Sequence, residues 1–205
     1  MSDPEYLTPL GMDAVAELMN MAMGQAAAAL NELVHEEVTL SVPSVRFLPV
    51  SEFETDIASS VDDQISVVDQ HIEGPFSGDV LLIFPEAKSL ELVRSLLGDE
   101  ISLEELTELE QDALIEIGNI LIGALVATLA DVLNCRFESE LPQYAKRDSD
   151  AILLNGCDRS ADIVMSVTIA FRLAHSEIDG YLSVVMSAGS MARFRTLIDG
   201  FVESV

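Results

Sequence analysis

The chain contains one long pattern twice, and this repeat restricts the possible folds more than any other feature of the sequence. Residues 13–34 (DAVAELMNMAMGQAAAALNELV) align without gaps on residues 112–133 (DALIEIGNILIGALVATLADVL) at a constant offset of 99. A period of about 100 residues is too long for a solenoid and is typical of a duplicated domain. We therefore predict a single domain over residues 1–205, made of two repeats at about 5–100 and 104–203.

Each repeat is predicted to fold as an α-β-β-β-α unit. Its first helix is apolar nearly all round, which is expected of a helix with neighbours on several sides. Apolar and β-branched runs predict strands at residues 37–50, 64–72, 79–85, 136–145, 162–174 and 180–186. The segments 73–78 and 175–180 have the composition of hairpin turns.

A second aligned block extends the repeat toward the end of each unit. It pairs Gly78 with Gly180 and Gly98 with Gly200 at an offset of 102. A short helix is predicted to close each unit, at residues 86–97 and 190–198, with Gly98 and Gly200 as C-terminal caps. Strands joined by hairpins pair antiparallel. The fold class is therefore α/β of the α+β type, with a continuous antiparallel sheet, both long helices on one face and an internal two-fold axis.

The chain is strongly acidic, with 36 Asp and Glu residues against 10 Lys and Arg residues and a formal net charge of −26. This balance excludes nucleic-acid and anionic-membrane binding, because both need a positively charged face. No run reaches the roughly 18 uncharged residues of a membrane span, and the first residues lack the basic start of a signal peptide. We therefore expect a cytoplasmic protein without membrane insertion. Its acidity fits a saline cytoplasm and an acidic mesophilic protein equally well.

Each long helix carries an Asp, a Glu, an Asn and a Gly at matching positions. These residues are Asp13, Glu17, Asn20 and Gly24, and then Asp112, Glu116, Asn119 and Gly123. The spacing i, i+4, i+7 and i+11 places them on one helix face. Positions that only pack have drifted between the copies, as in Val15 against Leu114 and Ala26 against Leu125. The preserved polar stripe therefore indicates a function, although a single E-x-x-N would be a weak signal.

The pattern D-x-x-x-E-x-x-N, followed after 22 residues by Pro, resembles the signature of the CheC, CheX and FliY family of chemotaxis phosphatases. Both halves fit it, since Pro43 and Pro142 complete the two copies. The core EIGN of that family occurs at residues 116–119, and the first copy reads ELMN. The resemblance covers the whole chain, and two sites in about this length are typical of the CheC type.

The resemblance implies that the protein hydrolyses the aspartyl phosphate of the response regulator CheY. Asn20 and Asn119 would position the attacking water, since a neutral amide both donates and accepts hydrogen bonds. Glu17 and Glu116 would pair with a basic residue beside the regulator's active site. An acyl phosphate is labile, so orientation of the water is the main requirement. The protein would need no cofactor of its own, because the regulator holds the Mg²⁺.

The other residues of the pattern are given supporting roles. Gly24 and Gly123 would allow the partner to approach the helix closely. We interpret Asp13 and Asp112 as residues of the helix start, where a carboxylate meets open N–H groups. Pro43 and Pro142 are expected at edge-strand or turn positions.

There are two alternative functions and two further partners. A non-catalytic, CheY-binding or flagellar-switch scaffold would resemble the middle domain of FliM, which lacks the Glu and Asn pair, so the intact duplicate motif favours the phosphatase. A metal-dependent hydrolase is disfavoured because the two cysteines and three histidines lack metal-ligand spacing.

The family resemblance also implies CheD, a receptor deamidase, as an activating partner. An unusual response regulator would equally serve as the substrate.

Overall fold

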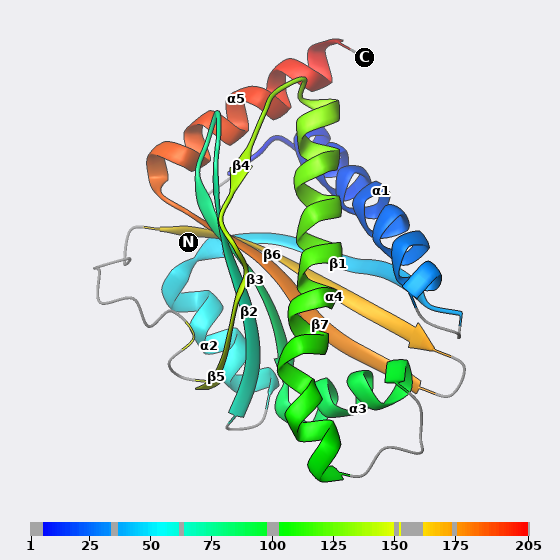
Figure 1. Cartoon of the computed structure of the whole chain (residues 1–205). Helices are drawn as coiled ribbons and strands as arrows, with labels where there is room; N and C mark the ends of the chain where they lie inside the picture. The colour runs from blue at the N-terminus through cyan, green and yellow to red at the C-terminus, as the bar shows by residue number, and fades with distance from the viewer. Residues whose placement is uncertain are drawn as a thin grey trace.

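The computed structural model describes residues 6–33, 37–61, 64–97, 103–149, 152, 162–173 and 176–204 (Figure 1). Their elements are, in chain order, α1 (Pro9–Leu33), β1 (Thr39–Pro49), α2 (Val50–Ser60), β2 (Gln64–Glu73), β3 (Gly78–Pro85), α3 (Glu86–Leu97), α4 (Leu103–Val132), β4 (Glu138–Ser139), β5 (Gln143–Asp148), β6 (Ile163–Leu173), β7 (Ser176–Met186) and α5 (Ala188–Ser204). The predicted mixed α/β class is confirmed, and α3 has the bounds that the sequence predicts.

The strands form one seven-stranded antiparallel sheet, as expected. Its order is β1-β6-β7-β3-β2, and both β4 and β5 pair with the outer edge of β2. β3 and β7 are therefore central, with Leu81 opposite Ser183. The two halves of the chain exchange their outer strands, since β1 pairs with β6 and β5 pairs with β2. The division into two repeats related by a two-fold axis stays a prediction, which superposition of residues 13–98 on 112–200 tests.

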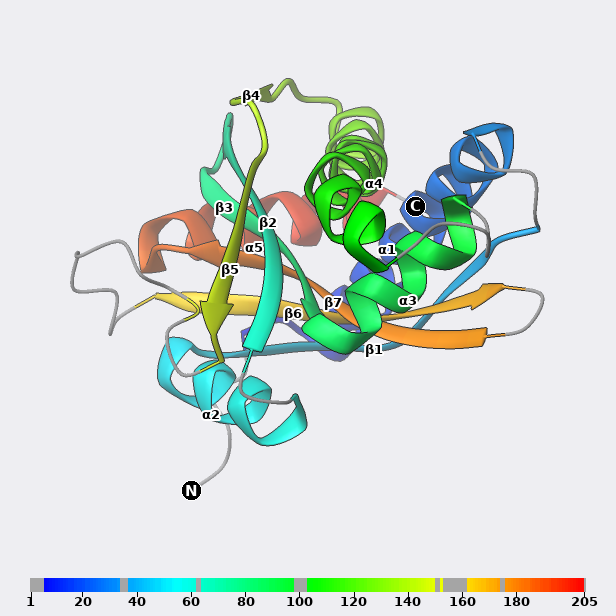
Figure 2. The ribbon, with the colours of Figure 1, turned by 60° about the horizontal axis from the view of Figure 1, so that its bottom comes forward.

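The two faces of the sheet support separate hydrophobic cores (Figure 2). One face is covered by α1, α3, α4 and α5, and the other face is covered by α2. Along β3, Val80 and Leu82 belong to the four-helix core, whereas Leu81 and Ile83 belong to the core beneath α2. Such alternation is the consequence of the two-residue period of a strand. The prediction that both long helices lie on one face is confirmed.

Helix α2 is absent from the α-β-β-β-α unit that the sequence predicts. It follows β1 directly, with Pro49 as its N-cap residue in an extended conformation. Val50, Phe53 and Ile57 form its buried side. This helix covers sheet residues that would otherwise meet solvent, such as Leu81. The i, i+3, i+7 spacing of its apolar residues is the signal that could have revealed it.

Two predictions about glycines in the second half are wrong. The segment predicted as a turn at residues 175–180 is mostly strand, because β7 begins at Ser176. Gly180 is required by packing, since a Cβ there would lie 2.4 Å from the Phe84 ring. Gly200 lies within α5, which continues to Ser204, and so it is not a cap. Gly98, the other predicted cap, lies outside the described residues.

Part of α4 meets the length and composition of a membrane span. The segment Leu109–Val132 is the one helical stretch of this kind among the described residues. In the structure, this helix packs against α1 and the sheet, and Leu114, Leu121 and Leu125 are buried in the four-helix core. The apolar side of α4 is therefore used within the fold.

Candidate functional site

The N-terminus of α1 is capped by a residue outside the predicted pattern. The Thr8 hydroxyl accepts a hydrogen bond from the Gly11 N–H at 3.1 Å, and Pro9 occupies the first helical position. Thr followed by Pro is a common helix start, because the hydroxyl caps an open N–H and proline has a helical φ. Asp13 therefore lies in the second turn of α1, and Asp112 lies nine residues after the start of α4 at Leu103. The interpretation of both aspartates as helix-start residues is wrong.

The two polar stripes lie on the solvent side of their helices. All eight members are exposed: Asp13, Glu17, Asn20, Gly24, Asp112, Glu116, Asn119 and Gly123. At 3.6 residues per turn they fall within about 60° of one another around each helix. The expected burial on several sides therefore holds only for the side that faces the core, because the exposed side holds this stripe and neighbouring residues such as Met21 and Gln111. No carboxylate of either stripe has to be removed from water.

The glutamates and asparagines of the stripes contribute no bonds to the described part of the fold. Within the part of the chain that the structure describes, Glu17, Asn20, Glu116 and Asn119 form no hydrogen bond or ion pair. Asn31, also on α1, is different: its amide donates to the Val38 carbonyl at 2.9 Å and accepts from the Val38 N–H at 2.6 Å. Asn is a mediocre helix former. The fold therefore explains Asn31 but not the asparagines of the stripes.

Gly24 and Gly123 are also unexplained by packing. A Cβ added at either position would meet nothing within 4 Å. Glycine inside a helix costs about 1 kcal/mol relative to alanine. Both helices therefore keep a destabilising residue at an open position of the stripe.

The difference between EIGN and ELMN lies on the buried side of the helices. A Cβ at Gly118 would lie 2.7 Å from Cγ1 of Val68, so α4 needs glycine to pack closely on β2. The matching residue of α1 is Met19, which is fully buried in the core. This difference therefore adapts each helix to its packing partner and leaves the exposed Glu and Asn unchanged.

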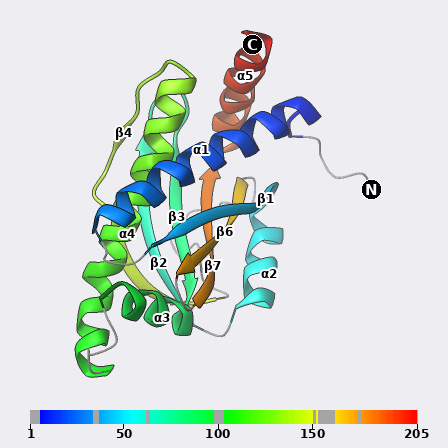
Figure 3. The same cartoon turned by 90° about the vertical axis from the view of Figure 1, so that its right-hand side faces the viewer.

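The helices that carry the stripes contact each other on one side of the sheet. Figure 3 shows α1 crossing over α4. Near this crossing, the Thr128 hydroxyl donates to Oε1 of Gln25 at 3.4 Å. The two prolines lie at the sheet edges: Pro43 is exposed in β1 beside a register shift, and Pro142 precedes β5. These are the edge or turn positions expected of proline.

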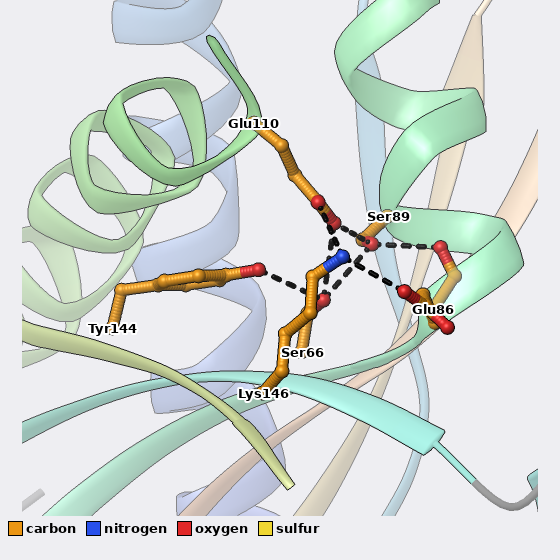
Figure 4. A network of polar contacts seen from close by, with 6 residues as sticks. All are labelled: Ser66, Glu86, Ser89, Glu110, Tyr144 and Lys146. Carbon is orange, nitrogen blue, oxygen red and sulfur yellow. Dashed lines mark hydrogen bonds and ion pairs between the residues drawn. The ribbon is translucent and has the colours of Figure 1, made fainter. Parts of the chain in front are cut away.

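A buried polar cluster beneath α4 was not predicted. Glu110 is only 1% exposed, and its Oε1 accepts hydrogen bonds from Ser89 at 2.6 Å and Ser66 at 3.1 Å (Figure 4). Its Oε2 lies 2.9 Å from Nζ of Lys146, which also contacts Glu86 at 2.8 Å. We call Glu110, Lys146, Glu86, Ser66 and Ser89 the Glu110 cluster. It ties α4 to α3, β2 and β5.

The electrostatics of this cluster favour a charged lysine. Burial alone would lower the pKa of Lys146, but its hydrogen bonds to Glu86 and Glu110 and the charge of Glu110 outweigh burial and raise that pKa. Burial raises the pKa of the Tyr144 hydroxyl, which lies 3.4 Å from Ser66 Oγ. No short sequence motif marks the cluster, because its members come from four separate elements.

The comparison with protein families concerns the first stripe directly. Residues 10–46 match the model of the CheC-like family, a stretch that holds Asp13, Glu17, Asn20, Gly24 and Pro43. The resemblance to that family is therefore confirmed.

Two curated relatives support the CheC-like resemblance over more of the chain. The CheY-P phosphatase CheC of Bacillus subtilis is 26% identical over 148 residues, which are 71% of this chain and 70% of that relative. The flagellar motor switch phosphatase FliY of the same organism is 24% identical over 174 residues. That match covers 84% of this chain but only 44% of FliY.

Solved structures show the same fold. The crystal structure of Thermotoga maritima FliY matches with a TM-score of 0.74 at 22% identity, covering 95% of this chain and 98% of that one. The FliM middle domain from H. pylori matches with a TM-score of 0.63 at 14% identity, covering 97% and 100%. The same fold thus occurs in T. maritima FliY and in a FliM middle domain. The fold alone does not decide the function.

Proposed function

We propose that this protein hydrolyses the aspartyl phosphate of a CheY-type response regulator, with Asn20 and Asn119 each orienting the attacking water. One observation carries the proposal: each of two helices presents an exposed Glu and Asn pair that forms no bond within the described residues. The name of the B. subtilis relative, a CheY-P phosphatase, supports the substrate class.

The proposed reaction needs little chemistry from the protein. Water attacks the phosphorus, the bond from phosphorus to the aspartate oxygen breaks, and the water proton leaves with the released phosphate or the solvent. The leaving group is a carboxylate, so no general acid is required. An amide oxygen of Asn20 or Asn119 would accept a hydrogen bond from the water and direct its lone pair at the phosphorus. Orientation of this kind supplies most of the rate enhancement when the substrate is intrinsically labile.

Glu17 and Glu116 would hold the regulator in register. Each lies three residues before its asparagine and faces solvent on the same helix face. A basic side chain beside the regulator's phosphate would pair with this carboxylate, which favours the correct orientation more than it adds affinity. The open positions of Gly24 and Gly123 would let the regulator's backbone approach the helix. The Mg²⁺ would be supplied by the regulator. A cytoplasmic location follows from this substrate, and CheD as a partner stays a prediction.

The second candidate is a non-catalytic scaffold that binds CheY or the flagellar switch. The match to the FliM middle domain favours it, because that domain has a similar fold. The two exposed Glu and Asn pairs favour the phosphatase instead, since a scaffold has no need of an amide that orients water.

The test is incubation of the protein with phosphorylated CheY-type regulators. Release of inorganic phosphate is compared with the regulator's own decay in the absence of the protein. The proposal expects faster release that grows with the concentration of this protein. Binding to the regulator without any acceleration would support the scaffold.

A further inference from the structure

The two stripes face the same way. Val15 and Ala22 of α1 and Leu114 and Leu121 of α4 are buried in one core on one face of the sheet. In each helix these residues follow the first stripe residue by two and nine positions, which places them about 180–200° around the axis at about 100° per residue. Both stripes therefore point away from the same sheet face, over helices that contact each other.

The distance between the stripes has an upper limit set by the helix crossing. Gln25 contacts Thr128, and Asn20 and Asn119 lie five and nine residues from these two positions. A rise of 1.5 Å per residue gives path lengths of about 8 Å and about 14 Å along the two helices. With about 10 Å between packed helix axes, the two asparagines lie within about 32 Å of each other. The glycine ends of the stripes are closer still.

A regulator is too large for two copies to use this surface together. A compact domain of about 100 residues has a radius of gyration of about 13 Å, which corresponds to a sphere about 34 Å across. Two such spheres centred over the two asparagines would overlap even at the largest spacing that the helices allow. Each regulator must also contact both the Glu and the Asn of the stripe at which it binds.

We propose that the two stripes form one docking face that accepts a single phosphorylated regulator at a time. This inference rests on the proposed function. Binding at the α1 stripe excludes binding at the α4 stripe, and the reverse holds equally. The second stripe then raises the chance that an encounter is productive, but it does not double the number of regulators bound.

The test uses tryptophan to block each stripe separately. Gly24→Trp and Gly123→Trp each place a large side chain at an open position of one stripe. Gly200→Trp is the matched control, because Gly200 is also an exposed helical glycine with nothing within 4 Å of a Cβ, but it lies on α5. Melting temperatures show whether each variant folds. Native mass spectrometry and calorimetry then count the regulators, loaded with Mg²⁺ and beryllofluoride as a phosphoryl mimic.

The proposal expects one regulator per chain for the unaltered protein and for Gly200→Trp. Each single stripe variant also binds one, with its association constant lowered by about twofold if the stripes are equal. The double variant binds none. With a phosphorylated substrate at saturation, the unaltered protein turns over at a rate between those of the two single variants.

The stoichiometry of the unaltered chain is decisive on its own. Two regulators per chain, or a saturated rate equal to the sum of the two single variants, would overturn the shared face and leave the phosphatase proposal intact. Loss of all binding in one single variant would overturn it too, because only one stripe would then dock. If the unaltered chain binds no regulator, the proposed function itself fails.

Discussion

Glu110 and Glu116 lie six residues apart on α4, but the first side chain is buried and the second faces solvent. Glu110 is 1% exposed and is held by two serines and a lysine, whereas Glu116 is exposed and has no bond within the described residues. The repeat adds a second contrast. The α4 stripe recurs on α1, but the positions matching Glu110, Lys146 and Ser89 hold Gly11, Phe47 and Met191.

This contrast separates polar residues that serve the fold from those that serve a partner. The Glu110 cluster satisfies buried groups, whereas the positions that match its members pack with apolar residues instead. There, the Phe47 ring lies 6.0 Å from the Phe194 ring. The glutamates and asparagines of the stripes form no bond within the described residues, but the stripes are kept in both halves. We infer that the Glu110 cluster serves the packing of α4 in this part of the fold, and that the stripes are kept in both halves because they contact a partner.

The largest expected effect is on stability, from Glu110→Ala. The change leaves Lys146 without its buried partner and the hydroxyls of Ser66 and Ser89 without their acceptor. Breaking a buried pair costs about 3–5 kcal/mol, and the lower end is expected because Lys146 is 33% exposed. Urea denaturation measures the change in the free energy of unfolding. Glu116→Ala is the control and should stay within about 0.5 kcal/mol of the unaltered protein. Equal losses in both variants would remove the contrast.

A smaller effect separates two asparagines of α1. Asn31→Ala removes both hydrogen bonds to the backbone of Val38, so it should lower the free energy of unfolding by about 1–2 kcal/mol. Asn20→Ala removes no bond within the described residues and replaces a poor helix former. It should leave stability unchanged or slightly raised in the same denaturation experiment. A loss at Asn20 as large as that at Asn31 would show that the stripe supports the fold.

Gly24→Ala and Gly123→Ala should each increase stability. A Cβ meets nothing at either position, so the gain is the helix propensity of alanine, up to about 1 kcal/mol per site. Thermal melting measures it, and the double variant should show the sum of the two gains. Gly118→Ala is the matched counterexample, because its Cβ would lie 2.7 Å from Val68 and should destabilise the protein. Unchanged melting at both stripe glycines would contradict this reading.

The smallest effect concerns alkaline pH. The pKa of Lys146 is raised in the folded protein, so the cluster's contribution is complete below the unfolded pKa of about 10.4 and is lost as pH rises above it. The raised pKa of Tyr144 acts in the same direction. Denaturation midpoints should therefore fall less steeply above about pH 10 in Lys146→Met than in the unaltered protein. If the denaturation midpoints of the two proteins fell equally steeply above about pH 10, the ionisation of Lys146 would not be coupled to folding.

Much of the fold could be predicted, because it depends on periodicity within single segments. The strands, the long helices and α3 follow from apolar patterns and turn residues, and the shared sheet face follows from the repeat. Helix α2 was missed because it is short and its role is to cover the far face of the sheet. Gly180 was misread for a similar reason: the Phe84 ring that excludes a side chain there belongs to another strand.

Only part of the candidate site could be predicted from the sequence. The stripe lies within one helix, so spacing alone places its residues on one face. That they are exposed and unbonded could not be read from an apolar helix. The Glu110 cluster was inaccessible to sequence reasoning, since Ser66, Ser89 and Lys146 lie 21–44 residues away from Glu110 along the chain. The capping role of Thr8 was missed, although Thr before Pro is a recognisable start.

We propose that the exposed asparagines act on a partner's phosphate and not on the fold. The most direct test is the rate of phosphate release from a phosphorylated CheY-type regulator with the Asn20→Ala/Asn119→Ala double variant. Gln111→Ala is the control, because this exposed residue lies on α4 about 100° from the start of the stripe. We predict that the double variant loses about 100-fold or more of the acceleration, while its melting temperature and the activity of the control stay unchanged. A double variant that is folded and still accelerates release like the unaltered protein would contradict the account.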